Sequence, residues 1–339
     1  MITITDVANL AGVSKATVSR VLNNSGYVNE DTRKRVEQIV KENHYVPSAS
    51  AIKLSKQEST AIGVVVPEID NLFYGDVLHG ITEIADQHDL SLVFFDTQNK
   101  AEKEVRALHT LSQQRVRGLI LAPAVDYSLS SLGRELRKQL KALDIPVVIV
   151  DRDSENMHWD GVFYESYQSS YRAAQILHKA GHTRLGIITG DLALKIGRDR
   201  LQGFRQGVLD NGLELRDEDI FEGDFLEERA YELSKKMFLS GDWPTAVYTC
   251  NNRTSLGFLK AARECKIRIG KDIAVIGNDR IAMIDQLGIP FSCVYRDNIE
   301  MGRMALKMLL ERIENPTRPR NICMIPYQVH LCGTEKLNP

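Results

Sequence analysis

The sequence lacks the motifs that carry most catalytic and phosphate-binding chemistry. It contains no G-x-S-x-G, no G-x-x-x-x-G-K-[ST], no G-x-G-x-x-G and no H-E-x-x-H pattern. Its eight histidines show no spacing typical of metal ligands. We therefore expect a protein that is not an enzyme and that needs neither a cofactor nor a metal ion.

Cysteine is scarce and the apolar runs are short. The five cysteines are odd in number, widely spaced and free of any C-x-x-C pattern, which predicts reduced thiols rather than disulfides or a zinc site. The apolar run Ile62–Val66 stops at Pro67, and neither an early apolar segment nor a run of membrane length occurs. We expect a cytoplasmic protein with no membrane partner.

The distribution of charge along the 339 residues is uneven. The chain is 43% hydrophobic and 26% charged, an ordinary globular composition for two or three domains. Residues 1–60 carry eight basic and six acidic side chains, whereas the remainder of the chain is net acidic. Only the N-terminal segment is suited to a polyanion, and its charge excess is so small that tight binding needs two copies acting together.

Residues 3–23 are spaced as a helix, a tight turn and a second helix. Apolar residues between Ile4 and Ala11 recur at helical spacing, and Gly12 ends the first helix. Ser14 is suited to cap the second helix. Any small helical hairpin shows such spacing, so DNA binding does not follow from it alone. The outward side of the second helix nevertheless offers the kind of side chains that read base edges and phosphates in the major groove: Lys15, Ala16, Ser19 and Arg20.

A third helix should complete this headpiece. Asn29 is placed to cap it, Val36 falls on its inner side, and the helix should end near Asn43. The polar segment that follows is typical of a linker between domains.

From Ala61 onward, short apolar runs alternate with amphipathic segments. Continuous apolar runs that alternate with helices predict parallel sheets covered on both faces, here two doubly wound lobes. Small ligands bind such sheets at the carboxyl ends of the strands. Strands are predicted at 61–66, 92–95, 118–121, 147–150, 185–189, 246–249 and 273–276, and helices at 73–87, 102–114, 169–179, 198–210 and 255–264.

The run TITDVANLAGVSKATVSRVLN at residues 3–23 resembles, nearly position by position, the N-terminal motif of the lactose-repressor/galactose-repressor (LacI/GalR) family of bacterial transcription regulators. The likeness continues through 32–36 and 43–54 and more weakly to the end. It implies an all-α helix-turn-helix headpiece at 1–46, a hinge helix and linker at 47–60, and an α/β periplasmic-binding-protein-like core at 61–339. The family pattern places lobe one at about 61–161 plus 292–320 and lobe two at about 162–291 plus 321–339.

The resemblance also implies how DNA is read. Two headpieces should bind an inverted repeat, with Arg20 contacting a guanine and Ala16 a thymine methyl group. Leu54 occupies the place of the hinge leucine that enters the minor groove at a central flexible step. The full set of DNA-binding residues carried over from the family is Thr5, Ser14, Lys15, Ala16, Thr17, Ser19, Arg20, Asn23, Ser48, Ala51 and Leu54.

The effector site is expected in the cleft between the lobes. An arginine fork and carboxylates suit the hydroxyls of a sugar, and aromatic faces suit its C–H side. Basic side chains near the rim suit a sugar acid or sugar phosphate equally well. A purely structural alternative is that Arg200 and Asp279 pair with each other. Matching the family position by position gives Phe73, Tyr74, Asp151, Arg200, Phe225, Asn251 and Asp279. Two further candidates complete the set: Arg152, a basic residue near the expected rim, and Glu165, which stands where relatives often have asparagine.

These expectations combine into a repressor that binds operator DNA as a homodimer under the control of a small molecule. The family's tetramers use a leucine-heptad helix after the core, whereas this sequence ends at Gly333–Pro339, so we expect a dimer. One alternative is a regulator that responds to a non-sugar ligand or to a protein partner. Another is a sugar-binding receptor without DNA function, which the helix-turn-helix motif opposes. Whether the effector releases or favours DNA binding stays open, because both occur in the family.

Overall fold

The computed structural model describes residues 2–22, 25–43, 45 and 60–337. The chain forms two compact units, Met1–Ser59 and Thr60–Pro339, and each is considered by itself. The candidate DNA-binding residues Asn23, Ser48, Ala51 and Leu54, and with them the expected hinge helix, lie outside the described residues.

The N-terminal unit contains three helices, α1 (Ile4–Ala11), α2 (Lys15–Leu22) and α3 (Glu30–Glu42). Thr3 caps α1, because its hydroxyl accepts a hydrogen bond from the Asp6 amide at 3.3 Å while the Asp6 carboxylate accepts one from the Thr3 amide at 2.8 Å.

Gly12 ends α1 with a φ of +63°, a left-handed conformation that favours glycine. Val7, Val18 and Val36 come one from each helix and are fully buried in a shared core. The three helices expected from the sequence are therefore confirmed.

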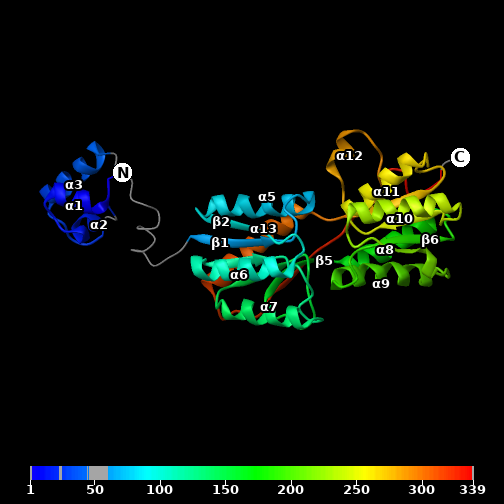
Figure 1. Ribbon diagram of the computed structural model, residues 1–339, viewed down its shortest axis with the longest axis horizontal. Coiled ribbons are helices and arrows are strands. Elements are labelled where there is room, and N and C mark those ends of the chain that lie inside the picture. The colour runs from blue at the N-terminus through cyan, green and yellow to red at the C-terminus, as the bar shows by residue number, and fades with distance from the viewer. Residues whose placement is uncertain (1, 23–24, 44, 46–59, 338–339) are drawn as a thin grey trace. The chain divides into compact units, whose positions relative to one another are not determined.

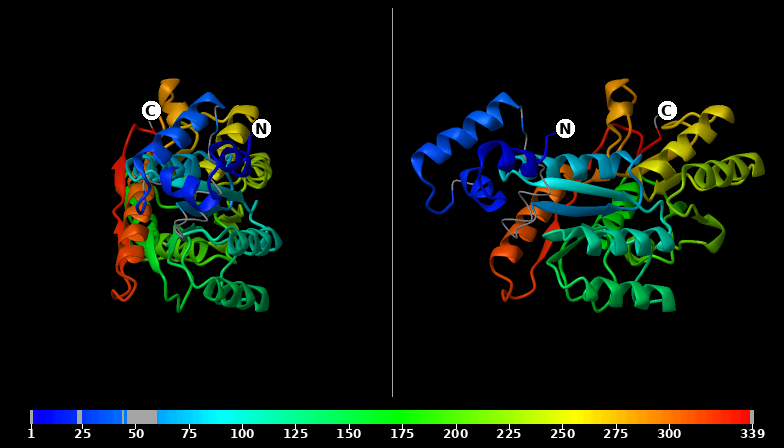
Figure 2. Two further views of the ribbon diagram at one scale, coloured as in Figure 1. Left: turned by 90° about the vertical axis from the view of Figure 1, so that its left-hand side faces the viewer. Right: turned by 60° about the vertical axis from the view of Figure 1, so that its left-hand side comes forward.

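The second unit begins with a six-stranded parallel sheet, which builds the first lobe. The strand order is β11-β5-β4-β3-β1-β2. Two helices cover each face, α5 and α13 on one side and α6 and α7 on the other (Figures 1 and 2). The strands are β1 (Ala61–Val66), β2 (Ser91–Asp96), β3 (Gly118–Leu121), β4 (Val147–Val150), β5 (Asp160–Tyr164) and β11 (Ile322–Ile325), and the helices are α5 (Leu72–Gln87), α6 (Ala101–Gln114), α7 (Ser131–Ala142) and α13 (Asn298–Glu314).

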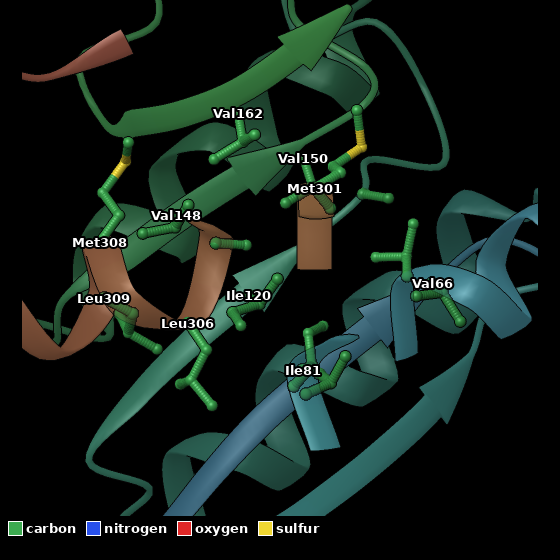
Figure 3. Packing of buried hydrophobic residues seen from close by; sticks show 14 of the residues in the cluster. Val66, Ile81, Ile120, Val148, Val150, Val162, Met301, Leu306, Met308 and Leu309 are labelled. Carbon is green, nitrogen blue, oxygen red and sulfur yellow. The ribbon is translucent and has the colours of Figure 1, made fainter. Parts of the chain in front are cut away.

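Burial of the sheet explains why its strands are apolar throughout rather than alternating. Ile120 and Val148 on neighbouring strands lie beneath Met301, Leu306 and Leu309 of α13, and all five side chains are fully buried (Figure 3). The opposite face is covered in the same way by α6 and α7. Side chains on both faces of the strands are thus removed from water, as the sequence pattern predicts.

The second lobe is built on another six-stranded sheet, with the order β12-β10-β9-β8-β6-β7. Only β12 is antiparallel, and it pairs with β10 at the edge. Helices α8 and α9 cover one face, and α10, α11 and α12 cover the other (Figure 1). The elements are β6 (Leu185–Thr189), β7 (Ile220–Glu222), β8 (Ala246–Thr249), β9 (Ala274–Asn278), β10 (Cys293–Tyr295), β12 (Gln328–His330), α8 (Ser166–Lys179), α9 (Lys195–Asp210), η1 (Asp217–Asp219), α10 (Glu227–Ser240), α11 (Asn252–Glu264) and α12 (Ala282–Gln286).

The chain crosses between the lobes three times, and each crossing lies further along than the sequence suggested. Strand β5 stays in the first sheet to Tyr164, β10 stays in the second to Tyr295, and β11 returns to the first and ends at Ile325. The expected boundaries at 161, 292 and 320 are therefore a few residues early. Each of these strands must complete its pairing in one sheet before the chain can leave it. None of the described helices is long and apolar enough to cross a membrane.

Candidate DNA-binding face and effector cleft

Helix α2 presents one buried side and one exposed side. Val18 and Val21 are buried against the headpiece core, whereas Lys15, Ala16 and Arg20 are exposed. A helix of this length can enter the major groove only with its exposed side. The structure thus brings the three expected base-reading side chains onto one accessible surface.

The other candidate DNA residues that the structure describes are Thr5, Ser14, Thr17 and Ser19. Ser14 is exposed, and its hydroxyl accepts a hydrogen bond from the Thr17 amide at 3.1 Å, which caps α2 as expected. Thr5, Thr17 and Ser19 are each partly exposed. Ser14 therefore has a structural task in addition to the DNA contact carried over from the family.

A polar cleft lies between the two lobes at the carboxyl ends of the strands. All of the candidate effector residues except Glu165 line it: Phe73, Tyr74, Asp151, Arg152, Arg200, Phe225, Asn251 and Asp279. Five further residues, which the sequence did not indicate, also line this cleft: Glu68, Asn71, Ile196, Asn252 and Arg296.

Glu165 does not reach this cleft. It stands between β5 and α8, at the point where the chain first changes lobe, and it lines a neighbouring groove with Tyr167 and Lys195. Glu165 thus occupies the expected position in the sequence, but its side chain lines the neighbouring groove and not the cleft. Lys195 itself is paired with Asp199 at 2.6 Å and with Asp153 at 3.3 Å.

Arg296 is the central side chain of the cleft. It lies on the second crossing between the lobes and is 2% exposed. One terminal nitrogen, Nη2, contacts Asp151 of the first lobe at 3.1 Å, and the other, Nη1, contacts Asp279 of the second lobe at 3.1 Å. Its guanidinium lies 4.2 Å from the ring centroid of Phe73 and 4.4 Å from that of Tyr164. Arg296 thus links both lobes through its two ion pairs and stacks on two aromatic rings of the first lobe.

Arg200 does not form the expected alternative pair with Asp279. Its Nη1 donates to the carbonyl oxygen of Cys250, and its guanidinium lies 5.5 Å from the Phe225 ring centroid. Its Nε is buried and has no hydrogen-bond partner among the described residues. Burial opposes the charge, but Asp279 and other nearby groups outweigh this effect and raise the pKa of Arg200. The guanidinium therefore stays charged inside the cleft.

Three cleft residues hold unusual backbone conformations. Asp151, Phe225 and Asp279 have φ values of +62°, +61° and +83°, a left-handed region that side chains with a Cβ rarely occupy. Asp151 and Asp279 come directly after β4 and β9. Backbone strain of this kind concentrates at functional sites, where the surrounding fold maintains it. Here it occurs at three residues that face the same cleft.

Ion pairs also close the rim of the cleft. Arg198 contacts Asp126 at 2.8 Å, and Arg253 contacts Glu68 at 3.1 Å and Asp70 at 2.9 Å. In each pair, as in Lys195 with Asp153, the cation belongs to the second lobe and the carboxylate to the first. The cavity that remains inside the cleft has a volume of only about 30 Å³. The structure therefore shows a closed state with room for water but not for a sugar-sized ligand.

Behind Arg152, Glu104 provides a buried ionisable group in the first lobe. It accepts hydrogen bonds from the Ala124 amide at 2.6 Å and from the Tyr127 hydroxyl. Burial raises the pKa of Glu104 to about 7, although those two hydrogen bonds and the charge of Arg152 act in the opposite direction. A carboxyl group whose pKa is higher in the folded chain stabilises the fold at low pH and loses that contribution as the pH rises.

We accordingly expect the Glu104→Gln variant, which resembles the protonated acid, to gain stability relative to the wild type between pH 5 and pH 8. The difference in melting temperature between the two proteins, measured across this range, checks the effect. Glu102→Gln, an exposed position on the same helix, should show no such trend. A constant difference for Glu104→Gln would mean that Glu104 is already ionised at pH 5.

Two family models match the chain. Bacterial regulatory proteins of the lacI family match residues 3–48, and the periplasmic binding proteins and sugar-binding domain of the LacI family match residues 59–331. The chain therefore belongs to the lacI family of bacterial regulatory proteins. The helix-turn-helix unit and the two-lobed α/β core are the two parts of that architecture.

Individual relatives agree with this assignment. The HTH-type transcriptional repressor PurR of Vibrio cholerae is 32% identical over 323 residues, which cover 95% of this chain and 94% of the relative. The ribose operon repressor of Haemophilus influenzae is 31% identical over 316 residues, 93% of each chain. The lac repressor dimer bound to operator and the anti-inducer ONPF superposes with a TM-score of 0.84 at 26% identity, covering 99% of both chains. These relatives are repressors and not enzymes, and this chain is likewise a transcriptional repressor of the family.

Proposed function

We propose that the repressor binds an inverted-repeat operator through the exposed side of α2, as a homodimer. The observation that supports this most directly is the placement of Lys15, Ala16 and Arg20 on one exposed surface over a fully buried core. The Arg20 guanidinium can donate hydrogen bonds to O6 and N7 of guanine. The Ala16 methyl group can make an apolar contact with the methyl group of thymine. Phosphate contacts would orient the helix without adding sequence information.

Selection of bound duplexes from a randomised DNA pool by the full-length protein tests the proposal. The recovered sequences should share an inverted repeat whose two halves are related by a twofold axis, with a guanine in each half that Arg20 reads. The variant Val18→Asp places a charge in the buried core of the headpiece, so it should not bind DNA and serves as the negative control. Recovery of sequences without twofold symmetry, or no enrichment at all, would contradict the proposed mode of binding.

The homodimer is proposed to form through apolar side chains that the core leaves exposed. Met283 and Leu287, on and just after α12, are 62% and 69% exposed, and Leu72 at the start of α5 is 52% exposed. Large apolar side chains in water often mark contact surfaces between subunits. A second copy of the chain is the proposed occupant, because an inverted repeat requires a twofold partner.

We expect the double variant Met283→Asp/Leu287→Asp to be largely monomeric at micromolar concentration, because four buried charges per dimer would face an apolar interface. Light scattering at several concentrations measures this. Leu239→Asp, at a leucine that is 73% exposed on α10, should leave the dimer intact. Operator affinity should fall only in the double variant. A double variant that remains dimeric would place the interface elsewhere.

A small molecule in the interlobe cleft is proposed to control operator affinity. The cleft combines aromatic rings, amides, carboxylates and guanidinium groups at the ends of two parallel sheets, where doubly wound folds bind polar ligands. This chemistry suits the sugar class, whether neutral sugar, sugar acid or sugar phosphate. The relatives are a PurR repressor, a ribose operon repressor and a lac repressor, so their names do not agree on one effector. We therefore infer the class of effector from the side chains of the cleft.

A further inference from the structure

The hydrogen bonds that the cleft residues already form distinguish between neutral and acidic effectors. The carboxylates, which were expected to receive sugar hydroxyls, already have donors. Asp151 accepts from Arg296 through Oδ1 and from the Tyr74 hydroxyl through Oδ2 at 3.0 Å. Asp279 accepts from Arg296 and Asn278 through Oδ1 and from the Asn252 amide through Oδ2 at 3.4 Å. Every oxygen of these two carboxylates therefore already accepts at least one hydrogen bond from the protein.

The donors of the cleft, in contrast, are in surplus. A guanidinium carries five N–H donors. Arg200 uses one nitrogen, Nη1, for the Cys250 carbonyl, and its buried Nε has no partner among the described residues. Within the described part of the chain, Arg152 likewise donates through Nη1 alone, to the Asn99 side chain at 2.7 Å and to the Pro123 carbonyl at 3.2 Å. Both side chains are more than nine-tenths buried.

The balance of charge points the same way. Within the described part of the chain, neither Arg152 nor Arg200 forms an ion pair with a carboxylate. Glu68, the remaining acid of the cleft, is paired with Arg253. Three buried arginines of the cleft therefore lie beside two buried aspartates, and Arg296 binds both aspartates itself. Glu104 lies behind Arg152 without an ion pair to it, and burial raises its pKa to about 7. Asp279 favours the charge of Arg200 through space but does not contact it. An anionic ligand would supply the direct counter-ion that this buried guanidinium lacks.

We propose that the cleft selects an anionic effector, whose carboxylate or phosphate group binds Arg200, and that Arg296 determines this selectivity by occupying Asp151 and Asp279. The inference rests on the proposed control of the repressor by a ligand in this cleft, and it narrows that ligand to the acidic members of the sugar class. The Phe225 ring beside Arg200 leaves an apolar face for the C–H side of the same molecule.

The closed cleft admits little more than water, so the lobes must part before such an effector enters. Arg296 holds one carboxylate in each lobe, and opening separates those two contacts. When the cleft closes again, the anion bound to Arg200 adds negative charge beside the buried arginines. Selectivity and closure thus depend on the same guanidinium.

Calorimetric titration and thermal shift on the full-length dimer test the inference with matched probes. These are D-glucose against D-gluconate and D-glucose 6-phosphate, D-ribose against D-ribonate and D-ribose 5-phosphate, and inorganic phosphate against sodium chloride of equal ionic strength. We expect at least one acidic probe to bind at least tenfold more tightly than its neutral counterpart. The carboxylate and phosphate probes distinguish between the two kinds of anion.

Variants then locate the site. Arg200→Gln should lose at least tenfold in affinity for the acid, while Arg205→Gln, at an exposed position on the same helix, should retain it. Arg296→Gln frees two carboxylates to accept hydroxyls, so it should shift preference toward the neutral sugar. Arg200→Gln keeps the inference testable if Arg296→Gln does not fold.

Equal binding of neutral and acidic probes, acids no better than sodium chloride, or a preference that survives Arg200→Gln would each overturn the inference. Operator binding is measured on the same samples. A protein that binds its operator but shows no preference for anions would overturn only this inference. Failure of the wild type to bind any operator would instead overturn the proposed function.

Discussion

Replacing Arg20 by alanine should weaken operator binding by about 2–6 kcal/mol per dimer. Each good contact between a side chain and a base edge contributes about 1–3 kcal/mol of discrimination, and a twofold-symmetric dimer loses that contact in both half-sites. Arg20 is exposed at the end of α2 and is not part of the headpiece core, so its removal should leave the fold intact.

Fluorescence anisotropy with the selected duplex, at one fixed salt concentration, measures the Arg20→Ala effect. The variant should also accept other bases at one position of each half-site. Lys41→Ala removes an exposed positive charge from the last turn of α3 and serves as the matched control for charge alone. An Arg20→Ala protein with wild-type affinity and base preference would show that α2 does not read the DNA.

Arg312→Met should lower the free energy of unfolding of the core by about 3–5 kcal/mol, the range found when one partner of a buried ion pair is removed. Arg312 holds Asp160 through two hydrogen bonds of 2.8 Å, from Nε and Nη2. The Asp160 side chain is fully buried and also accepts a hydrogen bond from the Asn321 amide. Without Arg312, this carboxylate would remain buried with its charge unpaired.

Urea denaturation of the wild type and Arg312→Met gives the difference in unfolding free energy. Arg268→Met breaks a pair of similar geometry with Asp272 on the surface, and it should have a much smaller effect, because exposed ion pairs are screened by water. The Arg312 pair connects the start of β5 to the end of α13, so its loss should destabilise the first lobe. A small loss for Arg312→Met would mean that water reaches Asp160.

The headpiece could be predicted closely because its signals are local. Thr3, Gly12, Ser14 and Asn29 act on backbone groups within four residues of themselves, and such caps are legible in the sequence. Strands β1, β3, β4, β6, β8 and β9 were equally clear, since buried parallel strands are uniformly apolar. Strand β5, which begins with Asp160 and Gly161, and the three-residue strand β10 were not predicted.

The covering helices α7, α10, α12 and α13 were not predicted, and for α7 and α10 there is a physical reason. Helices α7 and α10 each bury only one narrow stripe, which includes Leu136 and Leu140 in α7, and the rest of their surface is polar. Helix α11 was predicted to begin at 255, but Asn251 caps it by accepting from the Thr254 amide at 2.8 Å. A residue assigned to the ligand thus also has a structural role.

The family resemblance predicted most residues of the candidate site, but it did not predict the ion pairs and hydrogen bonds among them. Arg296 lies 145 residues from Asp151 in the sequence, and no local spacing indicates that the two form an ion pair. The crossing that carries Arg296 was also placed too early. The ion pair between Arg296 and Asp279, which leaves Arg200 without an ion pair, depends on the folded arrangement of the two lobes and could not be predicted from the sequence.

We propose that a ligand bound in the cleft changes the affinity of the headpiece for its operator, and that operator binding changes the affinity for the ligand. Operator affinity, measured by anisotropy with and without a saturating anionic ligand that binds at Arg200, tests this directly. We expect a change of at least fivefold in either direction, together with an equal change in ligand affinity when operator is added, since linkage is reciprocal. The same operator affinity with an occupied and an empty cleft would contradict the account.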